Sequence, residues 1–485
     1  MRKLIILTIV IIVIVPFQSF SQNMRFRIHL KDEKLREKVS VMKDKNGFVN
    51  VKSDNGEFDK ILRKYKYTVF EKAFPTAATK MLREVYYVEC DNAEFGDDLR
   101  KKFKIEIPYV KEIEDPIPTA SYTPNDNYYA NGTQTNLDLI HAKEAWDIAK
   151  DFPKIPVAIN DQGFQLEHED LSYQNVYGVN DISLFHGTFV AGCFGATINN
   201  TIGIASTGGL NTNISYSMGN SNWANDNKIL ELAQQGYRVI NCSWINSCSY
   251  DPTIALLYSE IRNTWNTVVV FGAGNGTQHC GGAKTYPASY ESCLSVTSVG
   301  HKNAIGVLEN GVARNWKDVH ERFVGDSTST HQHNDAVDIC APGYDVFSTA
   351  YQNTYAYSTG TSFAAPQVAG VAAMIMAVNP NLTANEVVNI LKSTADTTIY
   401  NIPQNANYIG KLGTGRLDAY KAVKTACSVD FNSTAFTGTS SETGCYISVT
   451  NSTIQNGANV TFDATKEVAL LSGFEVQAGA VFEAK

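Results

Sequence analysis

The sequence predicts an α/β protein: a parallel sheet flanked by helices on both faces, preceded by a small α+β unit and followed by a small all-β module. Three observations predict this. Between about residues 137 and 425, short β-branched apolar runs alternate with helical patterns. Residues 22–120 are rich in lysine and glutamate instead. From about residue 429, glycine-punctuated alternating segments follow without a helical pattern.

Residues 1–21 predict a secretory signal peptide. Two early cations precede an apolar run from Leu4 to Val15, and small residues follow around Ser19 and Ser21. The alternative is a membrane anchor, but the run is shorter than the roughly 20 residues that a spanning helix needs. No later stretch is apolar enough to span a bilayer. We therefore expect no transmembrane anchor after signal removal, and a secreted protein that is extracellular or attached to the outer cell surface.

Charge differs between the regions that follow. Residues 22–120 hold 21 Lys and Arg against 18 Asp and Glu, a net charge of +3. Residues 121–485 hold 18 against 31, a net charge of −13. This acidity argues against a nucleic-acid partner, because phosphate binding needs clustered cations. It suits an exported protein that holds Ca²⁺ on carboxylates.

The elements are assigned in chain order. In the first region, 84–90 predicts a strand and 93–103 a helix, and the proline-rich stretch 112–129 predicts an exposed linker. The central strand candidates are 155–160, 237–244, 267–275 and 293–300. The central helix candidates are 142–150, 186–196, 227–236 and 364–378. Continuous apolar strands between helices indicate a parallel sheet covered on both faces, whose active site lies at the carboxyl ends of the strands.

Nine cysteines in an exported chain predict disulfides. Spacing favours three local pairs, which are Cys242 with Cys248, Cys280 with Cys293, and Cys427 with Cys445. Cys193 and Cys340 lie in apolar surroundings, and we expect them to be buried thiols. None has the partner spacing of a zinc site.

Three short motifs carry candidate chemistry. Asp161 closes the strand "IPVAIND", His186 opens "HGTFVAG", and Ser362 opens the helical run in "GTSFAAPQVAG". Taken alone, Ser362 reads as a helix N-cap, with Pro366 tolerated in the first turn. Together the three supply a nucleophile, an imidazole base and a carboxylate that fixes its tautomer. We predict that Ser362 both caps the helix and acts as the nucleophile.

The order of the motifs restricts the family. All nine histidines precede Ser362, which excludes the α/β-hydrolase order, and Asp, His, Ser is the order of subtilisin. Residues 122–425 resemble a subtilisin-family (subtilase) serine endopeptidase of the thermitase-like branch. Besides the two long motifs, the resemblance rests on "YTPND", "HEDL", "NNTIGIA", "AGN", "CAPG" and "GRLDAYKAV".

The resemblance implies roles for individual residues. Asp161, His186 and Ser362 would form the triad, and the Asn275 side chain with the Ser362 backbone N–H would bind the oxyanion. It also implies a structural Ca²⁺ site, the one cofactor expected, with these ligands: the side chains of Asp126, Asp170 and Asn200, and the carbonyls of Ile198, Ile202 and Ile204. The alternative is that these are solvated loop residues. "HQHND" at 331–335 suggests zinc, but no third distant ligand is evident.

The chain also departs from the family pattern. Gln162 stands where Ser or Thr usually follows the aspartate, Phe189 replaces a second histidine, and only 25 residues separate Asp161 from His186. In the substrate-binding segment, small family residues give way to Ser243, Trp244, Ile245 and Asn246, and we expect Gly274 to contact substrate as well. Since Ile245 in place of a small residue would narrow the substrate-binding cleft, we predict a preference for small or short P1 side chains.

The flanking regions predict a zymogen. Residues 22–120 resemble an inhibitory propeptide that acts on its own enzyme, removed by autocleavage near Ala120, and residues 121–428 would be the catalytic domain. Residues 429–485 would be a module for sorting, attachment or substrate binding. We expect a monomeric secreted endopeptidase that cleaves protein or peptide substrates through an acyl-enzyme. The alternative is a catalytically silent scaffold that acts in binding or adhesion.

Overall fold

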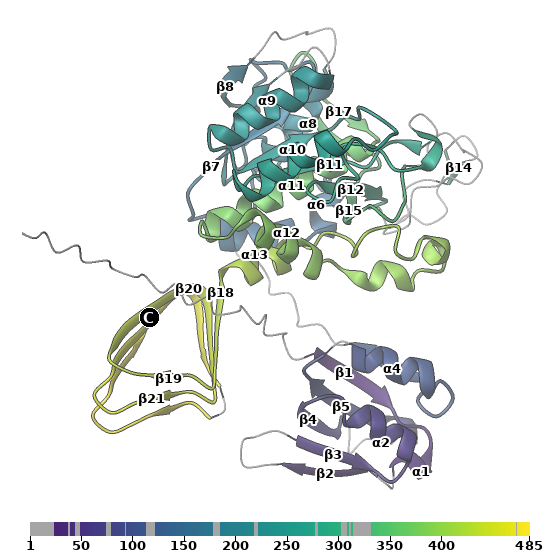
Figure 1. Cartoon of the computed structure of the whole chain (residues 1–485), viewed down its shortest axis with the longest axis vertical. Helices are drawn as coiled ribbons and strands as arrows, with labels where there is room; N and C mark the ends of the chain where they lie inside the picture. The colour runs from purple at the N-terminus through teal and green to yellow at the C-terminus, as the bar shows by residue number, and fades with distance from the viewer. Residues whose placement is uncertain are drawn as a thin grey trace, which may run out of the picture.

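The computed structural model describes residues 24–36, 39–43, 49–73, 79–92, 94–112, 122–177, 185–217, 222–276, 280–301, 308–309, 312–313, 331–471 and 473–485. Within them Figure 1 shows an N-terminal α+β unit, a central α/β unit and a C-terminal β unit. The expected signal peptide and Ala120 lie outside the described residues.

The N-terminal unit is a six-stranded antiparallel sheet in the order β2-β3-β4-β5-β1-β6. Its own core is built around Phe26, Phe58 and Phe95, all fully buried. The predicted strand at 84–90 and helix at 93–103 are confirmed as β5 and α4. The elements are β1 Met24–His29, α1 Glu33–Arg36, β2 Val39–Lys43, β3 Val49–Ser53, α2 Gly56–Leu62, β4 Tyr67–Lys72, α3 Lys80–Arg83, β5 Val85–Cys90, α4 Glu94–Lys102 and β6 Tyr109–Glu112.

The central unit contains a seven-stranded parallel sheet in the order β15-β12-β11-β10-β7-β9-β8, as the sequence predicted. Its strands are β7 Ile155–Asn160, β8 Tyr173–Tyr177, β9 Thr212–Ser217, β10 Val239–Cys242, β11 Val268–Gly272, β12 Leu294–Val299 and β15 Ile339–Pro342. A separate antiparallel pair is formed by β16 Val346–Ala350 and β17 Thr354–Ser358. The helices are α5 Asn127–Ala130, α6 Thr135–Leu139, α7 Ala142–Ala149, α8 His186–Gly195, α9 Asn222–Gln234, α10 Pro252–Asn263, α11 Thr361–Val378, α12 Ala384–Ser393 and α13 Ala419–Cys427.

Helices cover both faces of this sheet. Along β11, Val268 and Val270 point into the core that contains α8, α11 and α13, whereas Val269 and Phe271 point into the core with α9 and α10. Every residue of β11 is therefore buried, which explains the uninterrupted apolar run. The expectation that no later stretch is apolar enough to span a bilayer is wrong by length and composition: among the described residues α11 meets both criteria, but it is wholly buried inside the protein.

The C-terminal unit consists of two small parallel sheets between which the chain winds in stacked coils (Figure 1). The first sheet has the order β18-β20-β22-β24 and the second β19-β21-β23. Phe436, Phe462 and Val449 fill the space between them. The strands are β18 Ser428–Asn432, β19 Ala435–Phe436, β20 Thr439–Thr450, β21 Thr453–Ile454, β22 Asn459–Leu470, β23 Glu475–Val476 and β24 Val481–Ala484.

The disulfide prediction is partly wrong. Cys427 and Cys445 are bonded as predicted, but Cys248 is bonded to Cys280. Spacing along the chain misled the assignment, because two loops that are distant in sequence meet in space: Ser247 pairs with Tyr286 in a short bridge. The predicted partners Cys242 and Cys293 are therefore not in disulfides, and like Cys90, Cys193 and Cys340 they are buried.

Candidate active site

Asp161 lies directly after β7, at the carboxyl edge of the parallel sheet. Its backbone N–H donates to the Ser217 carbonyl at the end of the adjacent strand β9 (3.2 Å). Its side chain is 4% exposed, and Oδ1 accepts from the Gln162 N–H (2.7 Å) and from His186 Nδ1 (2.7 Å). The sheet therefore presents one buried carboxylate oxygen to an imidazole.

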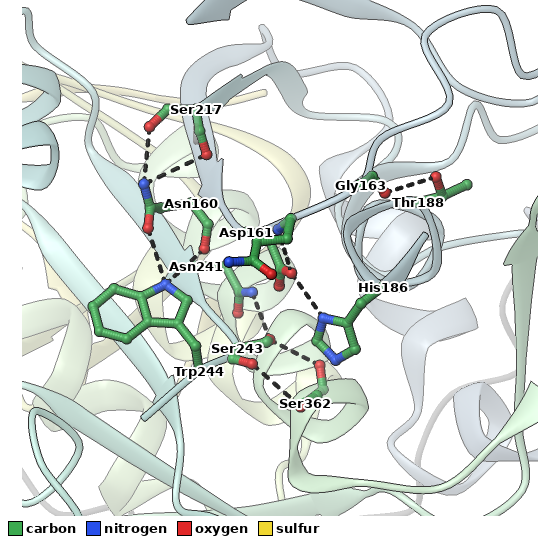
Figure 2. A network of polar contacts seen from close by, with 11 residues as sticks. Asn160, Asp161, Gly163, His186, Thr188, Ser217, Asn241, Ser243, Trp244 and Ser362 are labelled. Atoms are coloured by element: carbon green, nitrogen blue, oxygen red, sulfur yellow. Dashed lines mark hydrogen bonds and ion pairs between the residues drawn. The ribbon is translucent and has the colours of Figure 1, made fainter. Parts of the chain in front are cut away.

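His186 is the first residue of α8, and its imidazole lies between the Asp161 carboxylate and Ser362 (Figure 2). The ring also faces Phe363, with centroids 5.6 Å apart. Partial burial lowers the pKa of this imidazole, but the charge and hydrogen bond of Asp161 raise it by more, so the net shift is upward. The ring is thus poised to accept a proton.

Ser362 is the second residue of α11, and Gly360 is the N-cap. The prediction that Ser362 caps the helix is therefore wrong: its Oγ donates to the Ser243 carbonyl (3.3 Å) instead. Pro366 lies beyond the first turn, and because proline has no N–H, the Ser362 carbonyl lacks its usual intrahelical donor. The Ser243 hydroxyl donates to that carbonyl (2.9 Å), so Ser243 binds Ser362 twice.

Asn275 follows β11 and contacts the start of α11. Its Oδ1 accepts from the Thr361 backbone N–H (3.0 Å) and hydroxyl (3.1 Å). Since a backbone N–H can only donate, the amide oxygen must face the helix, which turns the Nδ2 group to the opposite side. Thr361, which the sequence analysis did not single out, thus fixes the orientation of the Asn275 amide.

The segment after β10 joins several parts of the site. The Ser243 Oγ accepts from Asn241 Nδ2 (3.0 Å) while donating to Ser362. The Trp244 indole N–H points away from Ser362 and donates to Asn160. The sequence indicates Asn160 and Asn241 only as strand residues. Their one available signal was an amide side chain in an otherwise apolar strand.

Ile245 packs against Gly274, whose φ is +115°. A Cβ on Gly274 would lie 3.0 Å from Ile245 Cδ1 and 2.8 Å from Gln332 Cγ, so only glycine fits here. The two predicted substrate residues are therefore in direct contact. The Cys248–Cys280 disulfide ties the end of this segment to the loop that follows Asn275.

The residues predicted to bind calcium also converge. Asp126 Oδ2 and Oδ1 accept from the N–H groups of Asn199 (2.8 Å) and Asn200 (3.1 Å). Asp170 accepts from Asn200 Nδ2 (2.9 Å) and the Ile204 N–H (2.8 Å). Both carboxylates are fully buried, and burial raises both pKa values, that of Asp170 to about 6.

The carbonyl residues of the predicted calcium site lie in the same loop, with Ile198 and Ile204 buried and Ile202 partly exposed. The two histidines of "HQHND" have other contacts. His331 Nδ1 forms a hydrogen bond with Ser298 Oγ, and the His333 ring packs against Tyr408. In the part of the chain that the structure describes, no three His, Cys, Asp or Glu side chains gather as a metal cluster.

A parallel sheet covered by helices, with an aspartate–histidine pair at its carboxyl edge beside a serine at a helix start, is the arrangement of a serine hydrolase with the chain order Asp, His, Ser. The chain belongs to the subtilase family, whose sequence model matches residues 153–416. It is a subtilisin-like serine endopeptidase.

Two proteins of similar sequence agree with this assignment. Thermitase from Thermoactinomyces vulgaris is 31% identical over 318 residues, which cover 62% of this chain and all of thermitase. The thermophilic serine proteinase of Bacillus sp. (strain AK1) is 32% identical over 325 residues, covering 63% of this chain and 70% of that proteinase. A solved structure of a protease from Pseudoalteromonas arctica has 25% identity and a TM-score of 0.49, covering 63% of this chain and all of that one.

Proposed function

We propose that this endopeptidase is secreted, is made as a zymogen, and cleaves peptide bonds through Asp161, His186 and Ser362. The observation that carries the proposal is the 2.7 Å hydrogen bond between Asp161 Oδ1 and His186 Nδ1, beside a serine at a helix N-terminus (Figure 2). This bond fixes the proton on Nδ1, so Nε2 is the basic nitrogen.

The catalytic cycle follows from these positions. Rotation about the Ser362 Cα–Cβ bond releases the hydroxyl from the Ser243 carbonyl, and Nε2 of His186 takes its proton as Oγ attacks the substrate carbonyl. Asp161 stabilises the imidazolium that forms. The imidazolium then protonates the leaving amine, and water hydrolyses the acyl-enzyme by the same route in reverse.

The tetrahedral intermediate needs donors for its negative oxygen. The Nδ2 group of Asn275 and the backbone N–H of Ser362 are the candidates, because both lie at the N-terminus of α11, where the helix dipole also favours negative charge. The bonds from Thr361 hold the Asn275 amide in one orientation, so no reorganisation is needed during the reaction.

A fluorophosphonate probe tests the triad. We expect wild type to be labelled and to hydrolyse casein, and Ser362→Ala to do neither, because the probe reacts only with an activated serine. Ser206→Ala is the matched control: it removes another buried serine, bonded to the Ala196 carbonyl, and should stay active. An unlabelled, inactive wild type would instead support the silent scaffold.

The N-terminal region supports the zymogen part of the proposal. Residues 1–21 have the composition of a signal peptide, and the N-terminal unit has a hydrophobic core of its own. We propose that this unit is the propeptide and inhibits the enzyme until autocleavage near Ala120. N-terminal sequencing of secreted protein should give a start between residues 115 and 125, and Ser362→Ala should remain uncleaved. A start well outside this range would contradict the proposal.

We propose that Asp126, Asp170 and Asn200 hold Ca²⁺, with the nearby carbonyls. Two fully buried carboxylates whose pKa values are raised by burial gain from a divalent cation, and oxygen donors suit Ca²⁺. Bound Ca²⁺ would stabilise the folded state. EDTA should lower the Tm of the Ser362→Ala protein, and Asp170→Asn should remove that difference. An equal EDTA effect in both would exclude this site.

The contact between Ile245 and Gly274 supports a preference for small P1 side chains, because the isoleucine occupies space beside the substrate-binding segment. A peptide library should give few cleavages after Phe or Tyr. Ile245→Gly should increase cleavage after large residues. A wild-type profile dominated by aromatic P1 residues would refute the preference.

A further inference from the structure

Asn160 is the last residue of β7 and directly precedes Asp161. It is 1% exposed, so its amide must find partners inside the protein. Its Nδ2 group donates to Ser217 Oγ (2.9 Å) at the end of β9. Its Oδ1 and its backbone carbonyl both accept from the Trp244 indole N–H (2.9 Å each), just beyond β10.

These bonds cross the sheet at its functional edge. Strand β7 lies between β9 and β10, and Asn160 is tied by side-chain bonds to residues that follow or end both neighbours (Figure 2). These side-chain hydrogen bonds extend the backbone hydrogen bonding between the strands at the end of the sheet where that backbone hydrogen bonding stops. The Trp244 ring is itself held by Phe271 on β11, with centroids 5.2 Å apart. The edge is therefore braced across four strands.

The Asp161 carboxylate has few bonds of its own. Oδ1 accepts two hydrogen bonds, whereas Oδ2 is buried and has no hydrogen-bond partner among the described residues. A carboxylate held through one oxygen depends on its backbone for position. That backbone is fixed by the N–H bond to Ser217 and by the braced residue before it.

We propose that Trp244 and Asn160 are positioning residues for the triad: the indole N–H bond to Asn160 holds the backbone of Asp161 so that its Oδ1 stays on His186. This inference rests on the proposed triad. Trp244 follows Ser243, which binds Ser362 twice, so one short segment contacts the nucleophile and braces the carboxylate.

Trp244→Phe tests the brace, because it keeps an aromatic ring near Phe271 and removes the N–H donor together with one ring of the indole. With active sites counted by fluorophosphonate titration, we expect kcat to fall about tenfold and KM to change less than about threefold, since misplacing a catalytic group slows chemistry more than binding. Trp265→Phe is the matched control. It removes a donor to Glu260 at the surface, and its kinetics should equal those of wild type.

The pH profile separates positioning from simple destabilisation. Among the described residues, Asp161 is the carboxylate that forms a hydrogen bond with His186. Its charge and hydrogen bond raise the pKa of the imidazole. If the carboxylate moves away in Trp244→Phe, the acid limb of kcat/KM should shift to lower pH. A variant that is only less stable would titrate fewer active sites, but each would keep the wild-type profile.

Ser217→Ala provides a second route should Trp244→Phe fold poorly. It removes the hydroxyl that accepts from Asn160 Nδ2, and it should also lower kcat and shift the acid limb downward. Wild-type kcat and pH profile in either folded variant would overturn the brace. Failure of wild type to react with the probe would instead overturn the proposed triad, so the two failures are distinguishable.

Discussion

The catalytic sheet and the C-terminal unit are both built from parallel strands, yet they bury them differently. In the catalytic sheet, β10, β11 and β12 are buried at every position, because helices cover both faces. In the C-terminal unit, the buried positions of β20 and β22 alternate with partly or fully exposed ones, because one face meets solvent. Parallel pairing alone therefore does not determine a strand's sequence pattern.

The connections differ in a way that matters for function. In the catalytic unit, β8, β9 and β10 lead to α8, α9 and α10, and α11 begins beside the residues that follow β10 and β11, so polar strand ends lie near helix N-termini such as those at His186 and Ser362. Strands of the C-terminal unit lead to tight turns such as the one at Gly457, whose φ is +81°. Only the first arrangement brings backbone donors and a helix dipole beside side chains at one edge. The predictions below, from largest to smallest effect, test this division between a catalytic edge and a supporting module.

The largest effect is expected at the catalytic edge. Asp161→Asn should lower kcat about ten-thousandfold, because an amide cannot hold the productive tautomer of His186 or stabilise its cation. Hydrolysis of a peptide substrate measures this. Asp226→Asn is the matched control: it changes a buried carboxylate in α9, bonded to Tyr258, and should alter kcat little. Equal losses would mean that any buried carboxylate matters, and would break the comparison.

The next effect is at the oxyanion donor. Asn275→Ala should lower kcat by a factor of about 100 to 1,000 and leave KM nearly unchanged, because the donor acts on the transition state. Asn211→Ala removes another buried amide, bonded to the Ala149 and Phe152 carbonyls, and should lower the Tm without changing kcat per active site. A KM effect alone in Asn275→Ala would argue against the oxyanion role.

The C-terminal unit should affect stability rather than rate. Replacing Cys427 and Cys445 with serine should cost about 3 kcal/mol of unfolding free energy, since the bond closes a loop with a sequence separation of 18. Urea unfolding in the Ser362→Ala background measures this without autolysis. Replacing Cys248 and Cys280 should also raise KM, because that disulfide holds the substrate-binding segment. A loss of kcat on opening Cys427–Cys445 would show that the module takes part in catalysis.

A smaller effect concerns pH. Because Asp161 raises the pKa of His186, and the imidazole must be neutral to act as a base, activity should fall as pH decreases through a value above the ordinary histidine pKa. The change should be the acid limb of the pH–kcat/KM profile. Deleting residues 430–485 should leave this limb in place. A limb below the ordinary histidine value would contradict the ion pair.

The smallest effect is at the contact between the two units. Lys466 Nζ donates to the Asp147 carbonyl (2.7 Å) and lies 3.4 Å from its carboxylate, and both side chains are about one-fifth exposed. Lys466→Met should cost about 1 kcal/mol or less in urea unfolding. Lys485→Met, whose partner Glu483 is mostly exposed, should cost nothing measurable. A larger loss would mean that the module and the catalytic unit unfold together through this contact.

Much of the fold could be predicted because the signals are local. The apolar run at 155–160 became β7 without a shift, and the run at 364–378 lies within α11. The residues proposed for catalysis stand at a strand end and at two helix starts, where sequence motifs are readable. The role of Pro366 was misjudged, because its position within the helix depends on where the cap falls.

The sequence by itself determined the order of buried strands and helices, the family, and the positions of Asp161, His186 and Ser362, because periodicity and short motifs record local structure. Only the tertiary structure decided that Cys248 pairs with Cys280, that Ile245 lies against Gly274, and that Trp244 holds Asn160. These contacts join segments that are tens of residues apart, and their geometry depends on how neighbouring strands and loops pack, which no local pattern records.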